Sequence, residues 1–338
     1  MSHTFFLYGL GMVADSPVPG VQAEPIASVD IHLFMGELPS WLSRLSPDQI
    51  EAWYISDYKD DSGNPTLRVF RLSAGKYFWF RYTDQTEFVI DQNATNIWAA
   101  WPNELTPEDT ATYLLGPVMG FVLLLRGSVS LHASAVVIDG HAVALTGPAG
   151  AGKSTTAAAF AEMGYRVLAE DVVTLDDHGD SFLIQPAYPC IRLWPESVEL
   201  LYGTNDLPRL TPNWDKRFLD LTQERYDFQK HPLPLSGIYL LAERSDDKDA
   251  PLIRELTHSE ALMALIANTY ATYLMDKQMR ARQFELLSRL LKTIPVREII
   301  PHTSPAKISQ LCRLIGEDFQ SLQLTARDQL SERHILNV

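Results

Sequence analysis

The stretch Gly147-Pro-Ala-Gly-Ala-Gly-Lys153-Ser154-Thr155 decides the fold of this chain. It follows an apolar run, His141 to Thr146, and precedes an alanine-rich segment, Thr156 to Met163, that is typical of a helix. The pattern G-x-x-x-x-G-K-[ST] between a strand and a helix is a phosphate-binding loop, because its glycines let backbone N–H groups turn toward phosphate oxygens. We therefore predict an α/β fold built around a nucleoside triphosphate site.

Each residue type in this loop has a predicted contact with ATP. Lys153 would supply positive charge to the β- and γ-phosphates, and we count it among the catalytic residues. Ser154 would offer its hydroxyl to Mg²⁺. The alternative is a glycine-rich turn without a ligand, and the complete motif in its proper context argues against it. The predicted cofactor-binding set is Gly147, Gly150, Ala151, Gly152, Lys153, Ser154 and Thr155.

An acidic pair follows the loop after one helix and one strand. Tyr165 to Ala169 form a predicted strand that delivers Glu170 and Asp171 at its tip. In a doubly wound sheet the carboxyl end of this strand lies beside the phosphate loop, so both carboxylates should face the γ-phosphate. One carboxylate can hold Mg²⁺ while the other orients a hydroxyl or accepts its proton. The alternative is an exposed acidic turn.

The strand before the loop belongs to a predicted hairpin. Val129 to Ile138 and His141 to Thr146 flank Asp139-Gly140, which is a strong hairpin-turn signal. His132 lies on the first of these strands, near the phosphate loop. A histidine in an apolar strand is either a core residue or a catalyst, and both interpretations stay open.

Three stretches together resemble the HPr serine kinase/phosphorylase family: Ser130 to Val136, Gly147 to Thr155, and Gly164 to Asp171. Within that family the chain is most similar to the shortened HPr-kinase-like proteins of peptide natural-product clusters, including lasso-peptide kinases. The resemblance covers roughly residues 110 to 310. It implies that His132 lies near the transferred phosphate, that Glu170 acts as the base, and that Asp171 binds metal. The family has Asp where this chain has Glu170.

The resemblance also implies residues that neutralise phosphate charge. A Glu-x-Arg signature of the family corresponds to Cys190-Ile191-Arg192, so Arg192 is retained while Cys190 replaces the carboxylate. Metal ligation at position 190 and reverse phosphorolysis are therefore in doubt. Lys216 and Arg217 are similar to a basic pair that the shorter relatives carry near the phosphates, or they are solvated loop charges.

The chain divides by pattern into three parts. Residues 1–105 alternate short apolar runs with turn clusters and predict a small mixed or mostly β domain, which does not resemble the N-terminal domain of the true HPr kinases. Residues 106–300 form the predicted P-loop HPr-kinase-like catalytic domain, and 301–338 a helical tail packed on it. Thr106 and Pro107 would begin a helix that runs to Leu125.

Composition limits the partners and the compartment. Lys and Arg number 28 against 42 Asp and Glu, which gives a net charge of −14 and disfavours nucleic acid and anionic membranes as partners. The longest apolar run, Tyr113 to Leu125, is shorter than the ~20 residues of a membrane-spanning helix and predicts a buried core helix. Two separate cysteines and the absence of a signal pattern favour a cytoplasmic protein.

The predicted function is an ATP- and Mg²⁺-dependent kinase that phosphorylates a serine-type hydroxyl of a peptide or carrier protein. A kinase of a small hydroxylated metabolite and a degenerate ATP-binding scaffold are the alternatives, and the chain could act as a monomer or a homo-oligomer. A GTPase is disfavoured because no Asn-Lys-x-Asp occurs. A transport ATPase is disfavoured because no complete Leu-Ser-Gly-Gly-Gln-type string follows the loop.

Overall fold

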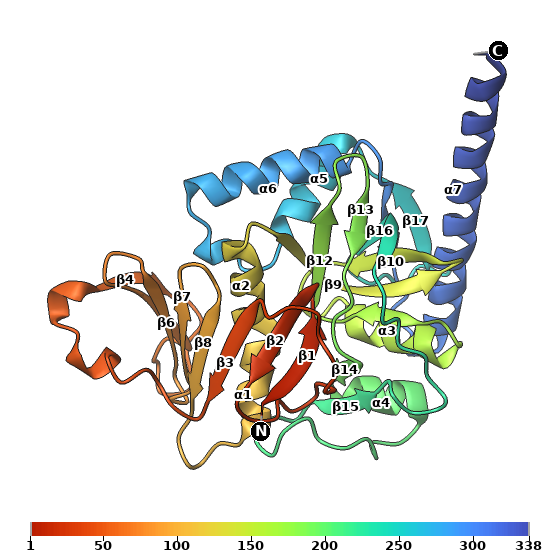
Figure 1. Cartoon of the computed structure of the whole chain (residues 1–338). Helices are drawn as coiled ribbons and strands as arrows, with labels where there is room; N and C mark the ends of the chain where they lie inside the picture. The colour runs from red at the N-terminus through yellow and green to blue at the C-terminus, as the bar shows by residue number, and fades with distance from the viewer. Residues whose placement is uncertain (1, 337–338) are drawn as a thin grey trace.

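The computed structural model describes residues 2–336, with side chains described to residue 325, and shows a mixed α/β protein (Figure 1). The N-terminal hundred residues form one eight-stranded sheet in the order β1-β2-β3-β8-β7-β6-β5-β4. Strand β3 is parallel to both of its neighbours, β2 and β8, and the other pairs are antiparallel. The strands are β1 (His3–Leu7), β2 (Leu10–Ala14), β3 (Ile31–Met35), β4 (Ile50–Ile55), β5 (Leu67–Leu72), β6 (Tyr77–Tyr82), β7 (Glu87–Asp91) and β8 (Asn96–Ala100). Two short 3₁₀ turns, η1 (Leu42–Arg44) and η2 (Pro47–Gln49), precede β4.

The predicted apolar helix joins this sheet to the rest of the chain. It consists of α1 (Pro107–Tyr113), a π-helical segment η3 (Leu114–Val118) and α2 (Met119–Leu125). Thr106 and Asp109 cap it reciprocally, as a capping box does. The π-helical segment contains Pro117, which has no N–H for the regular helical bond.

This helix is buried between the two sheets. The Phe121 ring packs against Phe78 and Phe80 of the N-terminal sheet, with ring centroids 5.0 and 5.2 Å away. By length and composition, Pro107–Leu125 could cross a membrane, but 78% of its apolar window is buried inside the protein. Burial to this extent is what a core helix shows. One hydrophobic cluster runs from the N-terminal sheet through this helix into the rest of the chain.

The second half of the chain forms one eight-stranded sheet around two long strands, each of which pairs with different strands along its length. Strand β9 (Val129–Ile138) pairs through its first residues with β12 (Val172–Asp177), and through its later residues with β10 (His141–Thr146) and β11 (Val167–Ala169). Strand β16 (Leu233–Leu241) pairs first with β13 (Phe182–Ile184), then with β10 and β18 (Val296–Ile300). Strand β17 (Leu252–Glu255) extends this sheet beyond β18.

The sheet differs from the doubly wound arrangement that the phosphate loop suggested. Only the β10–β16 and β16–β18 pairs are parallel, whereas β9 is antiparallel to all of its partners. The reason is local: Asp139 and Gly140, at φ of 50° and 80°, fold β9 directly back onto β10. The hairpin itself agrees with the predicted residues.

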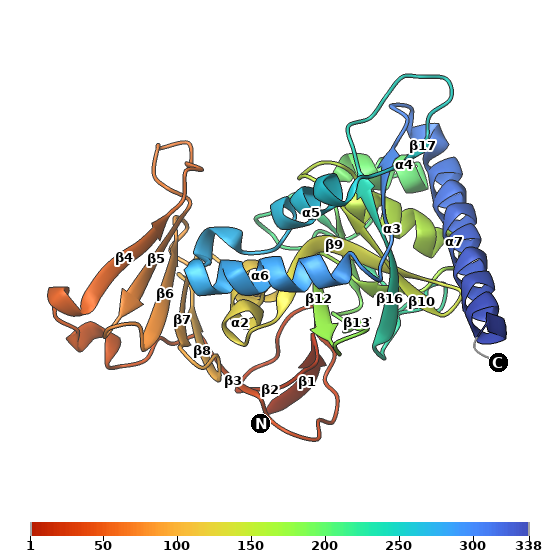
Figure 2. The ribbon, with the colours of Figure 1, turned by 90° about the horizontal axis from the view of Figure 1, so that it is seen from above.

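Helices cover the core sheets (Figure 2). Helix α3 (Lys153–Glu162) follows the glycine loop, and α7 (Ile308–Leu336) packs against it after a short turn η5 (Pro305–Lys307). Helices α5 (His258–Ala267) and α6 (Lys277–Leu290) pack on each other, with η4 (Thr272–Leu274) between them in sequence. A small hairpin of β14 (Cys190–Leu193) and β15 (Arg217–Asp220), with α4 (Pro195–Tyr202) in sequence between its strands, lies beside α3.

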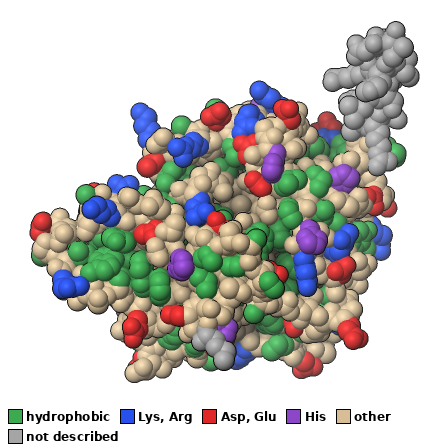
Figure 3. All heavy atoms as spheres, viewed as in Figure 1, with side chains coloured by type: hydrophobic (Ala, Val, Ile, Leu, Met, Phe, Trp, Pro, Cys, Tyr) green, Lys and Arg blue, Asp and Glu red, His purple; other side chains and the backbone are tan. Residues whose placement is uncertain are grey.

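One face of the molecule shows where hydrophobic side chains reach the surface. On the face shown in Figure 3, hydrophobic side chains gather over the outer part of the N-terminal sheet, while Lys and Arg side chains are scattered. The division at residue 105 stays a prediction, because the same hydrophobic cluster continues across it.

Candidate active site

The glycine loop joins β10 to α3 in a conformation that needs its glycines. Gly147, Gly150 and Gly152 have φ of 145°, 80° and 103°, a region that residues with a Cβ rarely adopt. A Cβ at Gly147 would also lie 2.6 Å from the Leu241 carbonyl oxygen on the neighbouring parallel strand. The loop therefore lies tightly against β16, and its backbone leads into the N-terminus of α3, where N–H groups are free to bind an anion.

Lys153, the first residue of α3, folds back over the loop. Its Nζ donates hydrogen bonds to the carbonyl oxygens of Gly147 (2.7 Å) and Pro148 (3.0 Å). Burial lowers the pKa of the ammonium, and the carboxylates of Asp171 and Glu170 oppose that shift. The lysine thus lies over the glycine loop, and its hydrogen bonds within the described part of the chain go to neutral carbonyls, which an anion can displace.

Ser154 and Glu170 form a direct pair. The Ser154 hydroxyl donates to Glu170 Oε1 at 2.7 Å, and the Glu170 side chain is almost fully buried. The sequence-based assignment gave the metal to Ser154 together with Asp171, but the contact is with Glu170. Both carboxylates nevertheless line the same cleft as Ser154.

Asp171 occupies a strained turn between β11 and β12. Its φ is 68°, and the Val172 N–H donates to the Glu170 carbonyl oxygen (2.8 Å) across it. A non-glycine residue in this region costs free energy and is commonly found at functional sites. Because the chain turns at Asp171, the Glu170 and Asp171 carboxylates reach different partners.

Three side chains hold Asp171. Arg192 on β14 donates from Nη2 to Oδ2 (2.6 Å), and the Tyr270 hydroxyl donates to the same oxygen (3.0 Å). His132 on β9 faces the other oxygen, with Nε2 3.4 Å from Oδ1. Burial acts to raise the pKa of the Asp171 carboxyl, but Arg192 and His132 outweigh it and hold that pKa far below its ordinary range. Asp171 is therefore an ionised carboxylate fixed in one orientation.

Arg192 connects both acidic residues. Besides Asp171, its Nε lies 3.4 Å from Glu170 Oε2 and its Nη1 donates to the Thr112 carbonyl oxygen in α1 at 3.4 Å. The guanidinium is buried, so the two carboxylates supply the opposite charge that a buried cation requires.

Both carboxylates, His132, Lys153, Ser154 and Arg192 line one cleft of about 310 Å³. It is lined by loop residues, by both carboxylates and by Arg192, together with Lys216 and Arg244 from outside the motif. The Lys216 ammonium lies 5.1 Å from the centroid of the Trp194 ring. Arg244 makes no hydrogen bond or ion pair with another residue in the part of the chain whose side chains are described, which leaves its charge available to a ligand.

Four residues that the sequence analysis singled out do not line the cleft: Arg217, Cys190, Ala151 and Gly147, whose carbonyl oxygen accepts from Lys153. Arg217 is buried on β15 and donates to Asn205 Oδ1 (3.1 Å) and to the Asp215 carbonyl oxygen (2.5 Å). Successive residues of an extended strand point to opposite sides, so Lys216 and Arg217 separate. Cys190 is buried away from the cleft, and Ala151 lines a neighbouring groove instead.

Two residues of the site were missed by the sequence analysis. Tyr270 follows α5, and its place became evident only from the fold, where its N–H binds the Ser130 carbonyl oxygen. Arg244 comes shortly after β16, which is parallel to the strand before the glycine loop. The carboxyl end of a strand parallel to the loop strand lies beside the loop.

The donor set fits a Mg²⁺ ion better than a zinc ion. The cleft offers a hydroxyl and two carboxylates, the hard oxygen ligands that Mg²⁺ takes together with phosphate oxygens and waters. Among the described residues, no group of three or more His, Cys, Asp or Glu side chains could hold a metal by itself. Ser154 and the carboxylate beside it would hold the ion only together with phosphates.

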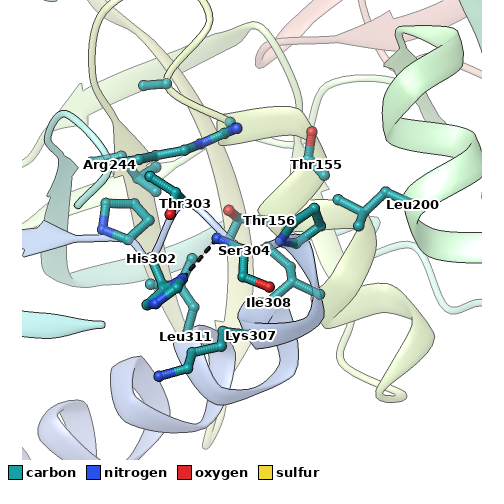
Figure 4. A pocket seen from close by; sticks show the side chains of 15 residues that line it. Thr155, Thr156, Leu200, Arg244, His302, Thr303, Ser304, Lys307, Ile308 and Leu311 are labelled. Atoms are coloured by element: carbon teal, nitrogen blue, oxygen red, sulfur yellow. Dashed lines mark hydrogen bonds between the residues drawn. The ribbon is translucent and has the colours of Figure 1, made fainter. Parts of the chain in front are cut away.

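A groove borders the loop on its other side (Figure 4). Arg244 and the residues Gly152 and Thr155 line both the groove and the cleft. Its far wall is the segment after β18, where the Ser304 N–H donates to His302 Nδ1 (2.7 Å), and Leu311 of α7 adds an apolar surface.

Comparisons with known proteins find likeness only among solved structures. No family model and no curated protein matches the chain. Among solved structures, the HPr(Ser) kinase/phosphatase from Coxiella burnetii aligns with 61% of this chain and 97% of its own length, at 18% identity and a TM-score of 0.35.

Proposed function

We propose that the protein is an ATP- and Mg²⁺-dependent phosphotransferase that moves a γ-phosphate to a hydroxyl group. The observation that carries the proposal is the cleft, in which a glycine loop, Lys153, a serine hydroxyl, two carboxylates and a buried arginine converge. Phosphoryl transfer requires a triphosphate cradle, metal ligands, a carboxylate near the acceptor and cations near the developing charge. A serine of a peptide or carrier protein and a small hydroxylated metabolite are both acceptors that this chemistry allows.

The loop amides and Lys153 would bind the phosphates, and the nucleobase would lie in the groove of Figure 4. Arg244 lines both the groove and the cleft, so its side chain would lie along the nucleotide between the base and the phosphates. Binding would release Lys153 from the two loop carbonyls and transfer its hydrogen bonds to phosphate oxygens.

Ser154 and Glu170 would hold Mg²⁺, because the loop hydroxyl contacts this carboxylate. Bound Mg²⁺ would neutralise charge on the β- and γ-phosphates. Asp171, next to His132, would orient the acceptor hydroxyl. The family resemblance implies the opposite assignment, with Glu170 as the base and Asp171 as the metal ligand. We exchange these roles because Ser154 contacts Glu170.

The proposed reaction is a direct transfer of the γ-phosphoryl group to the acceptor hydroxyl. The hydroxyl oxygen forms a bond to the γ-phosphorus, the bond from that phosphorus to the β–γ bridging oxygen breaks, and ADP leaves with the electron pair. The hydroxyl proton goes to the Asp171–His132 pair. Arg192 and Lys216 stabilise charge on the moving phosphoryl group.

The experiment is a mass-spectrometric assay with ATP and Mg²⁺ against serine-ended peptides, an HPr-type protein and a pool of hydroxylated metabolites. We expect one added phosphate on an acceptor, abolished by Lys153→Ala. Lys216→Ala should weaken transfer, whereas Arg217→Ala, its neighbour on the opposite side of the strand, should leave turnover per folded molecule unchanged. ATP binding without transfer to any acceptor would favour the scaffold alternative.

The two carboxylate roles can be separated by their readouts. Glu170→Gln should raise the Mg²⁺ concentration needed for half-maximal activity. Asp171→Asn should lower kcat with little change in that concentration. The reverse pattern would restore the assignment that the resemblance implies.

A further inference from the structure

A second cavity, of about 390 Å³, adjoins the cleft at Arg192. Arg192 lines both this cavity and the catalytic cleft. The cavity is bounded by Pro19 and Gly20 from the N-terminal region, by α1, by β14 and by residues 208–210 before β15. Parts of the chain that are far apart in sequence therefore meet around one space beside the active site.

The walls of this cavity are mostly apolar. Ala111 and Leu115 contribute from the helix, and Leu210 and Phe218 from the opposite side. The only charged side chains in its lining are Arg192, and Glu108 and Arg209, both of which are exposed. A cavity of this size with apolar walls and few polar groups is typical of a small-molecule site.

One buried hydroxyl in the cavity wall has no partner. Tyr188 is 3% exposed, and its hydroxyl makes no hydrogen bond with the side chains or backbone that the structure describes. Burial raises the pKa of this hydroxyl, and the guanidinium of Arg192, which lines the same cavity, opposes the rise. A buried hydroxyl without a partner costs free energy, and a polar ligand group would remove that cost.

Arg192 also has hydrogen-bonding capacity left. A guanidinium carries five N–H donors, and its recorded bonds go to Glu170, Asp171 and the Thr112 carbonyl oxygen. Two donors are thus left for an oxygen atom of a ligand in a space that Arg192 lines. A ligand oxygen next to Arg192 and Tyr188 would therefore lie beside the carboxylates that the proposed reaction uses.

We infer that this cavity binds the acceptor, and that the acceptor is a compact, largely apolar alcohol whose hydroxyl end contacts Arg192 and Tyr188. The inference rests on the proposed phosphotransferase function and assigns its substrate class. It also gives the N-terminal region a role, because Pro19 and Gly20 close the cavity. The hydroxyl would receive the γ-phosphate in the balanced step described above, with its proton going to the Asp171–His132 pair.

The test uses 4-fluorobenzyl alcohol as the probe, followed by ¹⁹F NMR on the full chain without nucleotide. For a probe of this size we expect saturable binding with a Kd on the order of 1 mM. The cationic analogue 4-fluorobenzylamine should not bind measurably, because its charge would lie beside Arg192. Two further measurements separate the cavity from unspecific binding.

Ala111→Leu should fill the cavity and weaken probe binding at least tenfold, since Ala111 lines it. Tyr188→Phe, which removes only the hydroxyl, should weaken it by roughly three- to tenfold, the value of one hydrogen bond to a neutral group. Tyr82→Phe is the matched control: its hydroxyl is also buried without a described partner, but it does not line the cavity. Equal binding in wild type and Ala111→Leu, or no saturable binding in wild type, would overturn the cavity assignment.

The acceptor role is tested by adding ATP and Mg²⁺ and measuring 4-fluorobenzyl phosphate by mass spectrometry. We expect product from wild type and Tyr82→Phe and at least tenfold less from Ala111→Leu. Saturable binding without product, in a preparation that phosphorylates another acceptor, would overturn this role. Because the ¹⁹F titration contains no nucleotide, a failure of ATP to bind would count against the proposed function and leave the titration result intact.

Discussion

Replacing Gly120 by alanine should separate helix propensity from the packing of the active site. Gly120 lies in α2, where alanine is ordinarily favoured over glycine by about 1 kcal/mol. A Cβ at this position would lie 2.4 and 2.7 Å from Cδ1 and Cε1 of Tyr270. The ring must therefore move, and the Tyr270 hydroxyl bond to Asp171 must weaken with it.

The expected size follows from these opposing effects. Forcing extra volume into a packed core costs about 1–3 kcal/mol. If the ring instead rotates away, the lost hydrogen bond to the ionised Asp171 costs about 1.5–3 kcal/mol. Either cost is at least as large as the gain in helix propensity, so Gly120→Ala should lower the free energy of unfolding by up to about 2 kcal/mol.

Urea denaturation of three further variants measures this prediction. Gly316→Ala in α7 is the control, because its Cβ would meet nothing closer than the Tyr165 hydroxyl at 3.9 Å, and it should stabilise by up to ~1 kcal/mol. A double-mutant cycle tests the contact with the ring: once Tyr270→Ala has removed that ring, Gly120→Ala should be neutral or stabilising. If Gly120→Ala stabilises the otherwise native protein as Gly316→Ala does, the reasoning is refuted.

Three other predictions test the site. Arg192→Met should lower the free energy of unfolding by about 3–5 kcal/mol at pH 7, because it leaves buried carboxylates without their cation; an unchanged urea midpoint would contradict this. The pKa of Asp171 is lowered in the folded state, so its contribution to stability is present above pH ~4 and is lost as pH falls below that. Urea midpoints measured from pH 7 to pH 3 should therefore fall less steeply for Asp171→Asn than for wild type. If the midpoints of the two proteins fall in parallel, Asp171 does not make this contribution. Gly147→Ala should weaken ATP binding, measured by calorimetry, more than Gly150→Ala does, because both have positive φ but only the first Cβ meets a backbone oxygen.

The parts of the fold that depend on local sequence were predictable. The hairpin around Asp139-Gly140, the strand–loop–helix unit and the helix beginning at Thr106 all agree with their sequence signals, since turn, cap and glycine patterns act over a few residues. The antiparallel pairing of β9 with β11 and β12 was not predicted, because the direction of a strand relative to distant partners is set by long-range packing.

The same distinction holds for the site. Lys153, Ser154, Glu170 and Asp171 were found because they follow predicted strands or belong to one motif, and they line one cleft. The contact of Ser154 with Glu170 and the role of Tyr270 depend on side-chain geometry that a linear pattern does not specify.

The turn at Asp171 has a consequence for how this protein can evolve. Its φ of 68° suits glycine, so replacing the aspartate by glycine would relieve backbone strain and also remove the carboxylate. Selection for greater stability and selection for chemistry therefore favour different residues at one position. In a lineage that has lost the proposed phosphotransferase activity, we expect position 171 to drift toward glycine. Relatives that retain the activity should keep a carboxylate there.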